Sequence, residues 1–209
     1  MVGRPQKRTR ETRDKILAAA CDLFDARGYE ETSVDAVAER AGVAKATVFA
    51  HFTDKTSLLI AARIGSLDAL AEAMRAAIDK GPSGDPADFL AGLLHPWLSL
   101  YRADPEFARL YLVQSTLKDA PWTRQFLDIC YRLEEAVIEA VTLLQRAGHL
   151  AAGAEPVLLA QGILAFFYHM IVGFSIGAIA QAEEQAAIFD RLVSRWLSTA
   201  RPLDADGVS

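Results

Sequence analysis

Apolar residues in this chain recur three and four positions apart almost from end to end, a spacing typical of helices packed on one side. No stretch alternates apolar and polar residues for long enough to predict a strand. Alanine and leucine, two strong helix formers, are abundant throughout. The sequence therefore predicts an all-α protein of about nine helices.

Glycine and proline mark where these helices break. The clearest interruption is residues 80–86, which contain two glycines and two prolines. We expect helices at 10–27, 34–41, 44–50 and 54–79 before it, and at 87–103, 105–117, 122–147, 156–181 and 185–200 after it. The ends, 1–8 and 202–209, are expected to be frayed tails.

Composition excludes several classes of protein. With 52% hydrophobic residues the chain is not of the disordered class, and its net charge of −5 does not make it globally basic. Residues 4–15 nevertheless hold six basic side chains against two acidic ones, which predicts local contact with a polyanion. Two distant cysteines favour reduced, packed thiols over a disulfide scaffold or metal cluster. No apolar segment follows the basic start, so we expect no secretory signal and a cytoplasmic protein.

The segments 34–41 and 44–50, separated by a tight turn at Gly42, have the pattern of a helix-turn-helix. In that motif the second helix enters the DNA major groove. At about 100° per residue, Ala44 and Val48 share one side and are expected to face the core. Four residues then point outward, with Thr47 on the flank and His51 nearer the core. The outward residues are Lys45, Ala46, Phe49 and Ala50.

An outward Phe is unusual on a solvated helix but suits contact with thymine methyl groups or sugars. Lys45 can reach a phosphate or a guanine edge, and Ala46 permits close approach. Lys55, in the first turn of the next helix, is expected to hold a phosphate together with nearby backbone N–H groups.

The residues from Arg10 to Leu59 resemble the DNA-binding region of the tetracycline-repressor (TetR) family. The resemblance implies a DNA-binding domain at 1–53, with its motif at about 33–52, and a helical effector-binding and dimerisation domain at 54–209. It also implies that Thr32 and Ser33 contact phosphate and cap the second helix. The pattern is Gly28-x-x-x-Thr32-Ser33-Val34-x-x-Val37-Ala38-x-x-Ala41-Gly42-Val43-Ala44-Lys45-x-Thr47-Val48-Phe49-x-His51-Phe52-x-Asp54-Lys55-x-x-Leu58. The implied DNA-binding residues are Thr32, Ser33, Lys45, Ala46, Thr47, Phe49, His51 and Lys55.

Two positions depart from the family pattern. Phe49 stands where the family often has Tyr, so one phosphate contact through a hydroxyl is lost. Ala44 stands where Ser is frequent, which removes a side-chain cap from the third helix.

Residues 157–182 carry no charged side chain, and 26 positions are enough to span a bilayer. Three polar residues interrupt the run and no basic anchor flanks it, so a buried helix is favoured over a membrane span. The resemblance assigns the last two helices to a four-helix dimer interface, whose symmetry would match a palindromic operator. The expected interface residues are Gly173, Gly177, Phe189, Leu192 and Trp196.

Aromatic residues are dense over 87–147, where a mostly apolar pocket for a small ligand is predicted. An acyl chain, an aromatic drug-like molecule and a hydrophobic metabolite all remain open. We expect no cofactor and no bound metal. The candidate lining residues are Trp97, Tyr101, Tyr111, Phe126, Tyr131, Phe167 and His169.

These observations predict a homodimeric transcriptional repressor that a small, largely apolar ligand releases from DNA. Two alternatives remain: a helical ligand-binding scaffold without DNA binding, and an activator or a repressor without an inducer. An enzyme is not expected, because the sequence contains no nucleophile elbow, HExxH, phosphate loop or Cys/His pair at metal-binding spacing.

Overall fold

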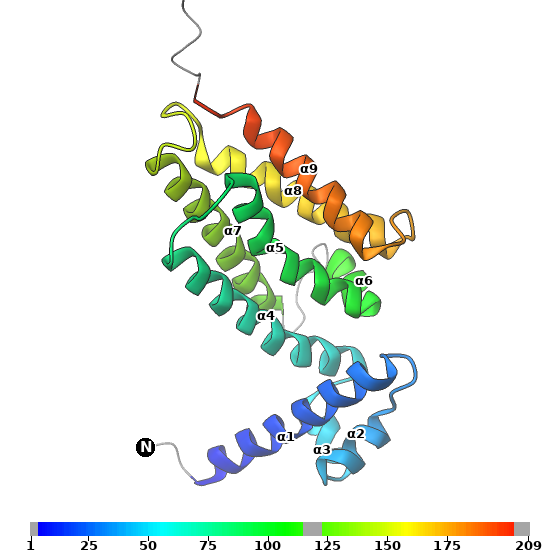
Figure 1. The fold of residues 1–209 in the computed structure, drawn as a ribbon. Helices are drawn as coiled ribbons and strands as arrows, with labels where there is room; N and C mark the ends of the chain where they lie inside the picture. Colours follow the sequence, from blue (N-terminus) through cyan, green and yellow to red (C-terminus); the bar gives the residue numbers. More distant parts are fainter. Residues whose placement is uncertain (1–3, 115–122, 203–209) are drawn as a thin grey trace, which may run out of the picture. The chain divides into compact units, whose positions relative to one another are not determined.

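A computed structural model describes residues 4–114 and 123–202, and within them the chain forms nine helices and no strand (Figure 1). The predicted all-α class is confirmed. The helices are α1 (Arg4–Arg27), α2 (Val34–Ala41), α3 (Lys45–His51), α4 (Lys55–Asp79), α5 (Pro86–Ala103), α6 (Pro105–Gln114), α7 (Thr123–Arg146), α8 (Pro156–Ser175) and α9 (Ala182–Ser198).

The helix α2 has the predicted bounds because both of its ends are capped. Ser33 Oγ accepts a hydrogen bond from the backbone N–H of Ala36 at 3.1 Å. Gly42 follows the last turn with φ of 67°, a left-handed conformation that suits glycine. Its N–H then donates to the carbonyl of Glu39 at 3.1 Å. The short turn to α3 follows from this geometry.

The basic N-terminal segment is helical rather than frayed. The helix α1 begins at Arg4, so the predicted tail over 1–8 is wrong for its described part. Pro5 in the first turn suits a helix start, and Lys7 pairs with Glu11 one turn later at 3.9 Å. The basic side chains of this segment therefore follow one helix. Most of the other predicted tail, 203–209, lies outside the described residues.

The helix α8 ends at Ser175, about one and a half turns before the predicted end. Gly177 adopts φ of 74° and turns the backbone away from the helix. The N–H of Ile179 then donates to the carbonyl of Gly173 at 3.1 Å. Gly173 and Gly177, two of the expected interface residues, are therefore not one turn apart on a helix.

By length and composition, α8 is the one described helix that could cross a membrane. Its most apolar window has a mean hydropathy of 1.9, and 39% of that window is buried. It packs along α9, with which it lies side by side in Figure 1. This is the arrangement of a core helix in a soluble fold.

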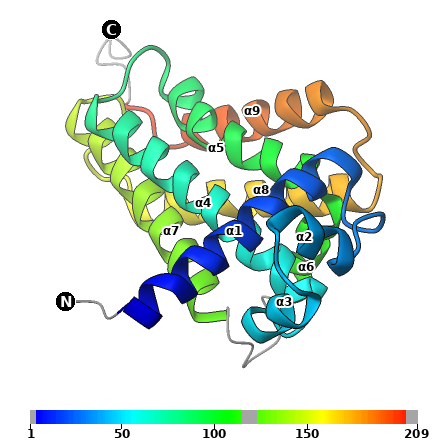
Figure 2. The same cartoon turned by 90° about the horizontal axis from the view of Figure 1, so that it is seen from below.

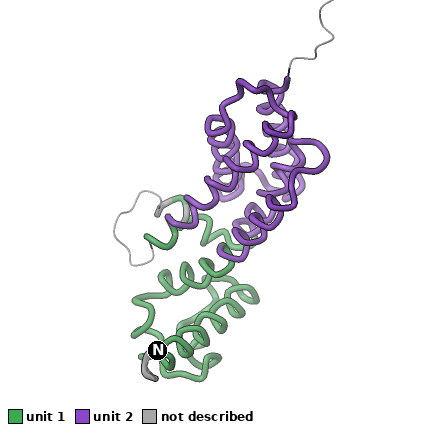
Figure 3. The backbone as a smooth tube through the Cα atoms, turned by 90° about the vertical axis from the view of Figure 1, so that its left-hand side faces the viewer, with its two compact units in different colours: residues 1–67, 103–126 green, residues 68–102, 127–209 purple. Residues whose placement is uncertain are grey.

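The chain divides into two compact units (Figure 3). The first comprises residues 1–67 and 103–126, and the second residues 68–102 and 127–209. The helix α4 contributes to both, so the division differs from the predicted functional boundary at residue 53, which stays a prediction.

Each unit has its own apolar core. In the first, α1, α2 and α3 pack together around Ile16, Val37 and Val48, all at most 1% exposed (Figure 2). In the second, Trp97 and Phe189 are among the largest buried side chains.

Candidate DNA-binding surface and ligand pocket

The helix α3 has one buried and one exposed side. Val48 is 1% exposed and anchors the helix, whereas the neighbouring Phe49 is 45% exposed. Lys45, Ala46 and Ala50 are also exposed, as predicted. These four outward residues, Lys45, Ala46, Phe49 and Ala50, are hereafter called the α3 face.

Ala44 was expected to face the core, but it is exposed. It is the N-cap residue, with extended backbone at φ −71° and ψ 147°, so the helical rotation that relates it to Val48 does not apply. As predicted for an alanine at this position, no side chain caps the N-terminus of α3.

Lys45 is held by an ion pair in the DNA-free chain. Its Nζ lies 2.8 Å from Oδ2 of Asp35 on α2, and both side chains are more than half exposed. Thr47 is half-buried, which agrees with its predicted place on the flank. The two helices of the motif are thus bridged at the surface by a pair that water and salt weaken.

Thr32 and Ser33 lie side by side in sequence but have different environments. Thr32 is 2% exposed, and its hydroxyl donates to the carbonyls of Gly28 and Leu23, at 2.8 and 3.2 Å. That hydroxyl supports the connection from α1 to α2, and the geometry gives no support to the predicted phosphate contact. Ser33 is exposed and caps α2, as predicted.

The last two predicted DNA-binding residues are partly engaged within the unit. His51 is half-buried at the end of α3, beside the ring of Phe52. Lys55 donates from Nζ to the carbonyl of Glu30 at 3.2 Å, and its Nζ lies 4.1 Å from the ring centre of Tyr29. Its ammonium is placed by these contacts at the start of α4.

A buried charge network in the first unit was not predicted. Arg63 of α4 is 5% exposed and donates to Asp25 of α1 at 2.7 Å and to Asp104 at 2.8 Å. Burial opposes its charge, but the hydrogen bonds to both carboxylates outweigh that cost and raise its pKa above the ordinary arginine value. Asp104 also caps α6 through the N–H of Phe107. The available signal was one arginine inside the apolar run 58–64.

The structure does not bring the seven predicted pocket residues together. Tyr101 and Phe167 are buried and pack edge to face, with ring centres 6.2 Å apart. Phe126 is buried in the first unit, whereas Tyr131 is 62% exposed and His169 is also exposed. The side chain of Tyr111 lies outside the described residues.

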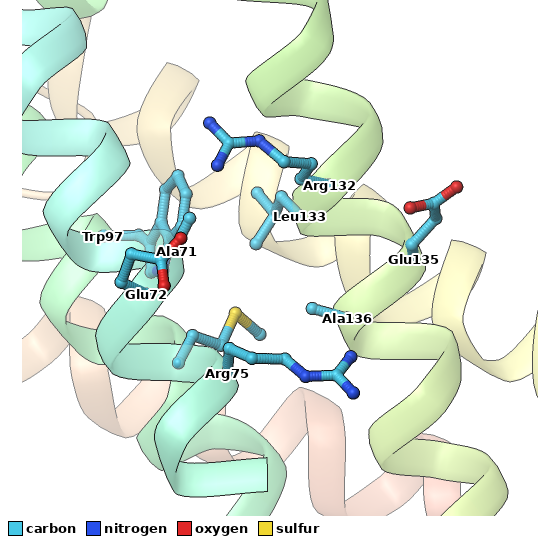
Figure 4. Close-up of a pocket in the computed structure, with 9 residues that line it drawn as sticks. Ala71, Glu72, Arg75, Trp97, Arg132, Leu133, Glu135 and Ala136 are labelled. Carbon is cyan, nitrogen blue, oxygen red and sulfur yellow. The ribbon is translucent and has the colours of Figure 1, made fainter. Parts of the chain in front are cut away.

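Of the candidates whose side chains the structure describes, only Trp97 lines the pocket among α4, α5 and α7, a space of about 240 Å³ in the second unit. Figure 4 shows Arg132 reaching from α7 toward α4 and Arg75 reaching from α4 toward α7. The hydrogen bond to Asp68 raises the pKa of Arg132, against the cost of its burial. The lining residues are Ala71, Glu72, Met74 and Arg75 of α4, Trp97 of α5, and Arg132, Leu133, Glu135 and Ala136 of α7.

Residues 16–62, which include α2, α3 and the α3 face, match the family model described as bacterial regulatory proteins, tetR family. This segment is of the tetR type. The match covers most of the predicted segment from Arg10 to Leu59. The matched family is one of regulators, which agrees with the expectation that the chain is not an enzyme.

Curated regulators are similar to this chain over part of its length. The transcriptional regulator TcmR of Streptomyces glaucescens is 34% identical over 101 residues, covering 48% of this chain and 43% of TcmR. The chain spans less than half the length of the curated relatives it matches.

Solved structures agree on the tetR fold over most of the chain. A TetR-family regulator from Pectobacterium atrosepticum has a TM-score of 0.72 at 22% identity, covering 95% of this chain and 98% of that one. FadR of Bacillus subtilis, solved with stearoyl-CoA, has a TM-score of 0.64 at 18% identity, covering 88% and 97%. At these identities the likeness concerns the fold alone.

Proposed function

We propose that this protein is a cytoplasmic, homodimeric transcriptional regulator that binds a palindromic operator and acts as a repressor. The observation that carries the proposal is the α3 face. It combines a half-exposed Phe49 with Lys45 and two alanines on a helix anchored by Val48. An apolar ring and a cation on a helix with small neighbours suit entry into a major groove.

The basic start of α1 supports the same function. Lys7, Arg8, Arg10, Arg13 and Lys15 all lie on this one helix. Salt-sensitive phosphate contacts from such a helix would add affinity that does not depend on base sequence.

Dimerisation is supported by apolar residues that α8 leaves exposed. Val157, Leu158 and Tyr168 are 50%, 51% and 39% exposed. Leu158, Ala165 and Tyr168 recur at helical spacing, so they share one face of the helix. Phe189 is fully buried within its own unit, so we place the interface on this face of α8 rather than on Phe189.

Two subunits related by a two-fold axis would present two α3 helices about 34–36 Å apart, the spacing of successive major grooves. Occupancy of DNA is sufficient to block transcription, so repression is the simplest outcome.

A small ligand is proposed to release the protein from its operator. The helix α4 supplies Glu72 and Arg75 to the pocket and Arg63 to the first unit. A ligand that binds more tightly to the DNA-incompetent state would raise the population of that state. The helix α4, which is shared by the two units, would carry the change to the DNA-binding helices. The structure of FadR from Bacillus subtilis in complex with stearoyl-CoA supports the proposal of a ligand with an apolar part.

The test is fluorescence anisotropy with DNA flanking the protein's own gene, against scrambled DNA, at two salt concentrations. We expect sequence-dependent binding by a species that sediments as a dimer. Lys45→Ala should weaken it by about 1–3 kcal/mol if the lysine reads a base. Lys80→Ala removes the same charge from an exposed site in the second unit and should change little.

Binding to no DNA, including a random library, would overturn the proposal in favour of the ligand-binding scaffold. Equal loss for Lys45→Ala and Lys80→Ala would show that only overall charge matters. Stronger transcription from the operator in the presence of the ligand-free protein would indicate an activator.

A further inference from the structure

The pocket among α4, α5 and α7 contains a buried hydrogen-bond donor without an acceptor, the indole N–H of Trp97. Trp97 is 1% exposed, and its Nε1 has no hydrogen-bond partner. Arg132 Nε is also buried and makes no hydrogen bond, although Asp128 Oδ2 lies 3.3 Å away. Both residues line the same pocket. Since buried N–H groups are nearly always satisfied, the unpaired Nε1 of Trp97 indicates a missing acceptor.

The charges around the pocket restrict what kind of acceptor it takes. Arg132 is paired with Asp68 and Asp128. Arg75 is paired with Asp79 and Glu139. Both cations are therefore already neutralised.

The wall itself holds two further carboxylates, Glu72 and Glu135, and neither forms an ion pair within the described residues. Six carboxylates thus stand against two guanidinium groups. A ligand carboxylate or phosphate would meet this excess of like charge.

A cationic ligand would suit the charge balance but not the unpaired indole donor. An ammonium group has only N–H groups to offer, so Trp97 Nε1 would stay unpaired. A neutral carbonyl or ether oxygen satisfies the donor without adding charge. Met74, Leu133 and Ala136 supply apolar surface for the rest of the molecule.

We propose that this pocket binds a neutral, mostly apolar molecule whose oxygen accepts a hydrogen bond from Trp97 Nε1. A volume of about 240 Å³ lies below the roughly 300–1,000 Å³ typical of ligand pockets, so the ligand is small. This inference rests on the proposed function, because the molecule bound in this pocket would be the inducer.

Three probes with the same nine-carbon chain separate the possibilities: methyl nonanoate, nonanoate and nonylammonium. Isothermal titration calorimetry on the full chain should show methyl nonanoate binding most tightly. Trp97→Phe keeps an aromatic ring but removes the N–H, and should weaken the ester by roughly threefold to tenfold.

The matched control is Trp196→Phe. Its indole N–H already donates to the carbonyl of Leu159 at 3.0 Å, and it does not line the pocket. This variant should bind methyl nonanoate as the wild type does. Glu72→Gln removes one negative charge from the wall and should improve nonanoate binding while leaving the ester unchanged. Circular dichroism confirms that each variant is folded.

The proposal is overturned if no probe binds saturably, if nonanoate or nonylammonium binds as tightly as the ester, or if Trp97→Phe and wild type bind the ester equally. Anisotropy on operator DNA separates this failure from that of the proposed function. Ester binding by a protein that binds no DNA would support the site and overturn the regulator. DNA binding without ester binding would support the regulator and overturn the proposed ligand site.

Discussion

The α3 face and the ligand pocket are two candidate binding sites of different construction. The α3 face comes from seven consecutive residues, of which Val48 is buried and Phe49 is exposed. The pocket draws Arg75, Trp97 and Arg132 from three helices that are far apart in sequence. A site on one helix follows from helical periodicity, whereas a pocket between helices depends on how those helices pack.

The two sites also differ in the use of charge. At the α3 face, Lys45 has one exposed carboxylate partner that solvent and phosphate can replace. In the pocket, each arginine is paired with two carboxylates. The first arrangement leaves a cation available for a polyanion, and the second does not.

The largest expected effect is on the free energy of unfolding and concerns Arg63, whose ion pairs join segments of the first unit that are far apart in sequence. Arg63→Met removes a cation buried between Asp25 and Asp104. Asp104 would remain 6% exposed without its counter-charge, so we expect the free energy of unfolding to fall by about 3–5 kcal/mol. Urea denaturation followed by circular dichroism measures this loss.

Asp25→Asn is the control for that experiment, because the Asp25 side chain is 64% exposed. It removes the partner that water can replace, so its cost should stay below about 1 kcal/mol. Equal costs for Arg63→Met and Asp25→Asn would contradict the assignment of Asp104 as the buried partner.

A smaller effect is expected where α8 meets α9 in the second unit. A Cβ at Gly162 would lie 2.4 Å from the Trp196 ring, so Gly162→Ala should cost about 1–3 kcal/mol of the free energy of unfolding. Gly92→Ala, inside α5 with no atom within 4 Å, should instead stabilise by about 0.5–1 kcal/mol. Urea denaturation midpoints of the two variants give the comparison.

If the free energy of unfolding falls for Gly162→Ala and rises for Gly92→Ala, packing against α9, rather than helix propensity, explains the glycine at position 162. A stabilised Gly162→Ala would mean that the Trp196 ring moves aside at little cost.

The sequence predicted the first unit more closely than the second for physical reasons. The bounds of α2 follow from Ser33 and Gly42, both adjacent to the helix they end. The side chains of Lys45 and Phe49 follow from rotation along α3. Periodicity does not reveal the burial of Thr32, whose hydroxyl donates to carbonyls of the α1 end and the following turn.

In the second unit, local patterns found the helices but not their contacts. Aromatic density indicated Trp97, which lines the pocket, but it also selected Tyr131, which is exposed. Nothing local to Arg75 or Arg132 indicates that both reach one pocket. The end of α8 was missed because the positive φ of Gly177 overrides an otherwise continuous apolar helical pattern.

The smallest expected effect tests whether Lys45 is available to DNA. Asp35→Asn removes the carboxylate 2.8 Å from Lys45 Nζ and one negative charge near the α3 face. The free lysine should then bind phosphate or base without first breaking an ion pair, and we expect operator affinity to rise about twofold to fivefold. Anisotropy at low and high salt should show the gain shrinking as salt screens the pair.

Asp88→Asn provides the matched control for that gain. Asp88 also lies exposed in the first turn of its helix, α5, so both substitutions remove a similar interaction with a helix N-terminus. Only Asp35→Asn should change DNA affinity, because only Asp35 is paired with a residue of the α3 face. If Asp35→Asn leaves affinity unchanged while Lys45→Ala lowers it, the lysine keeps its carboxylate partner on DNA. The contrast between an available cation at the α3 face and neutralised cations in the pocket would then fail.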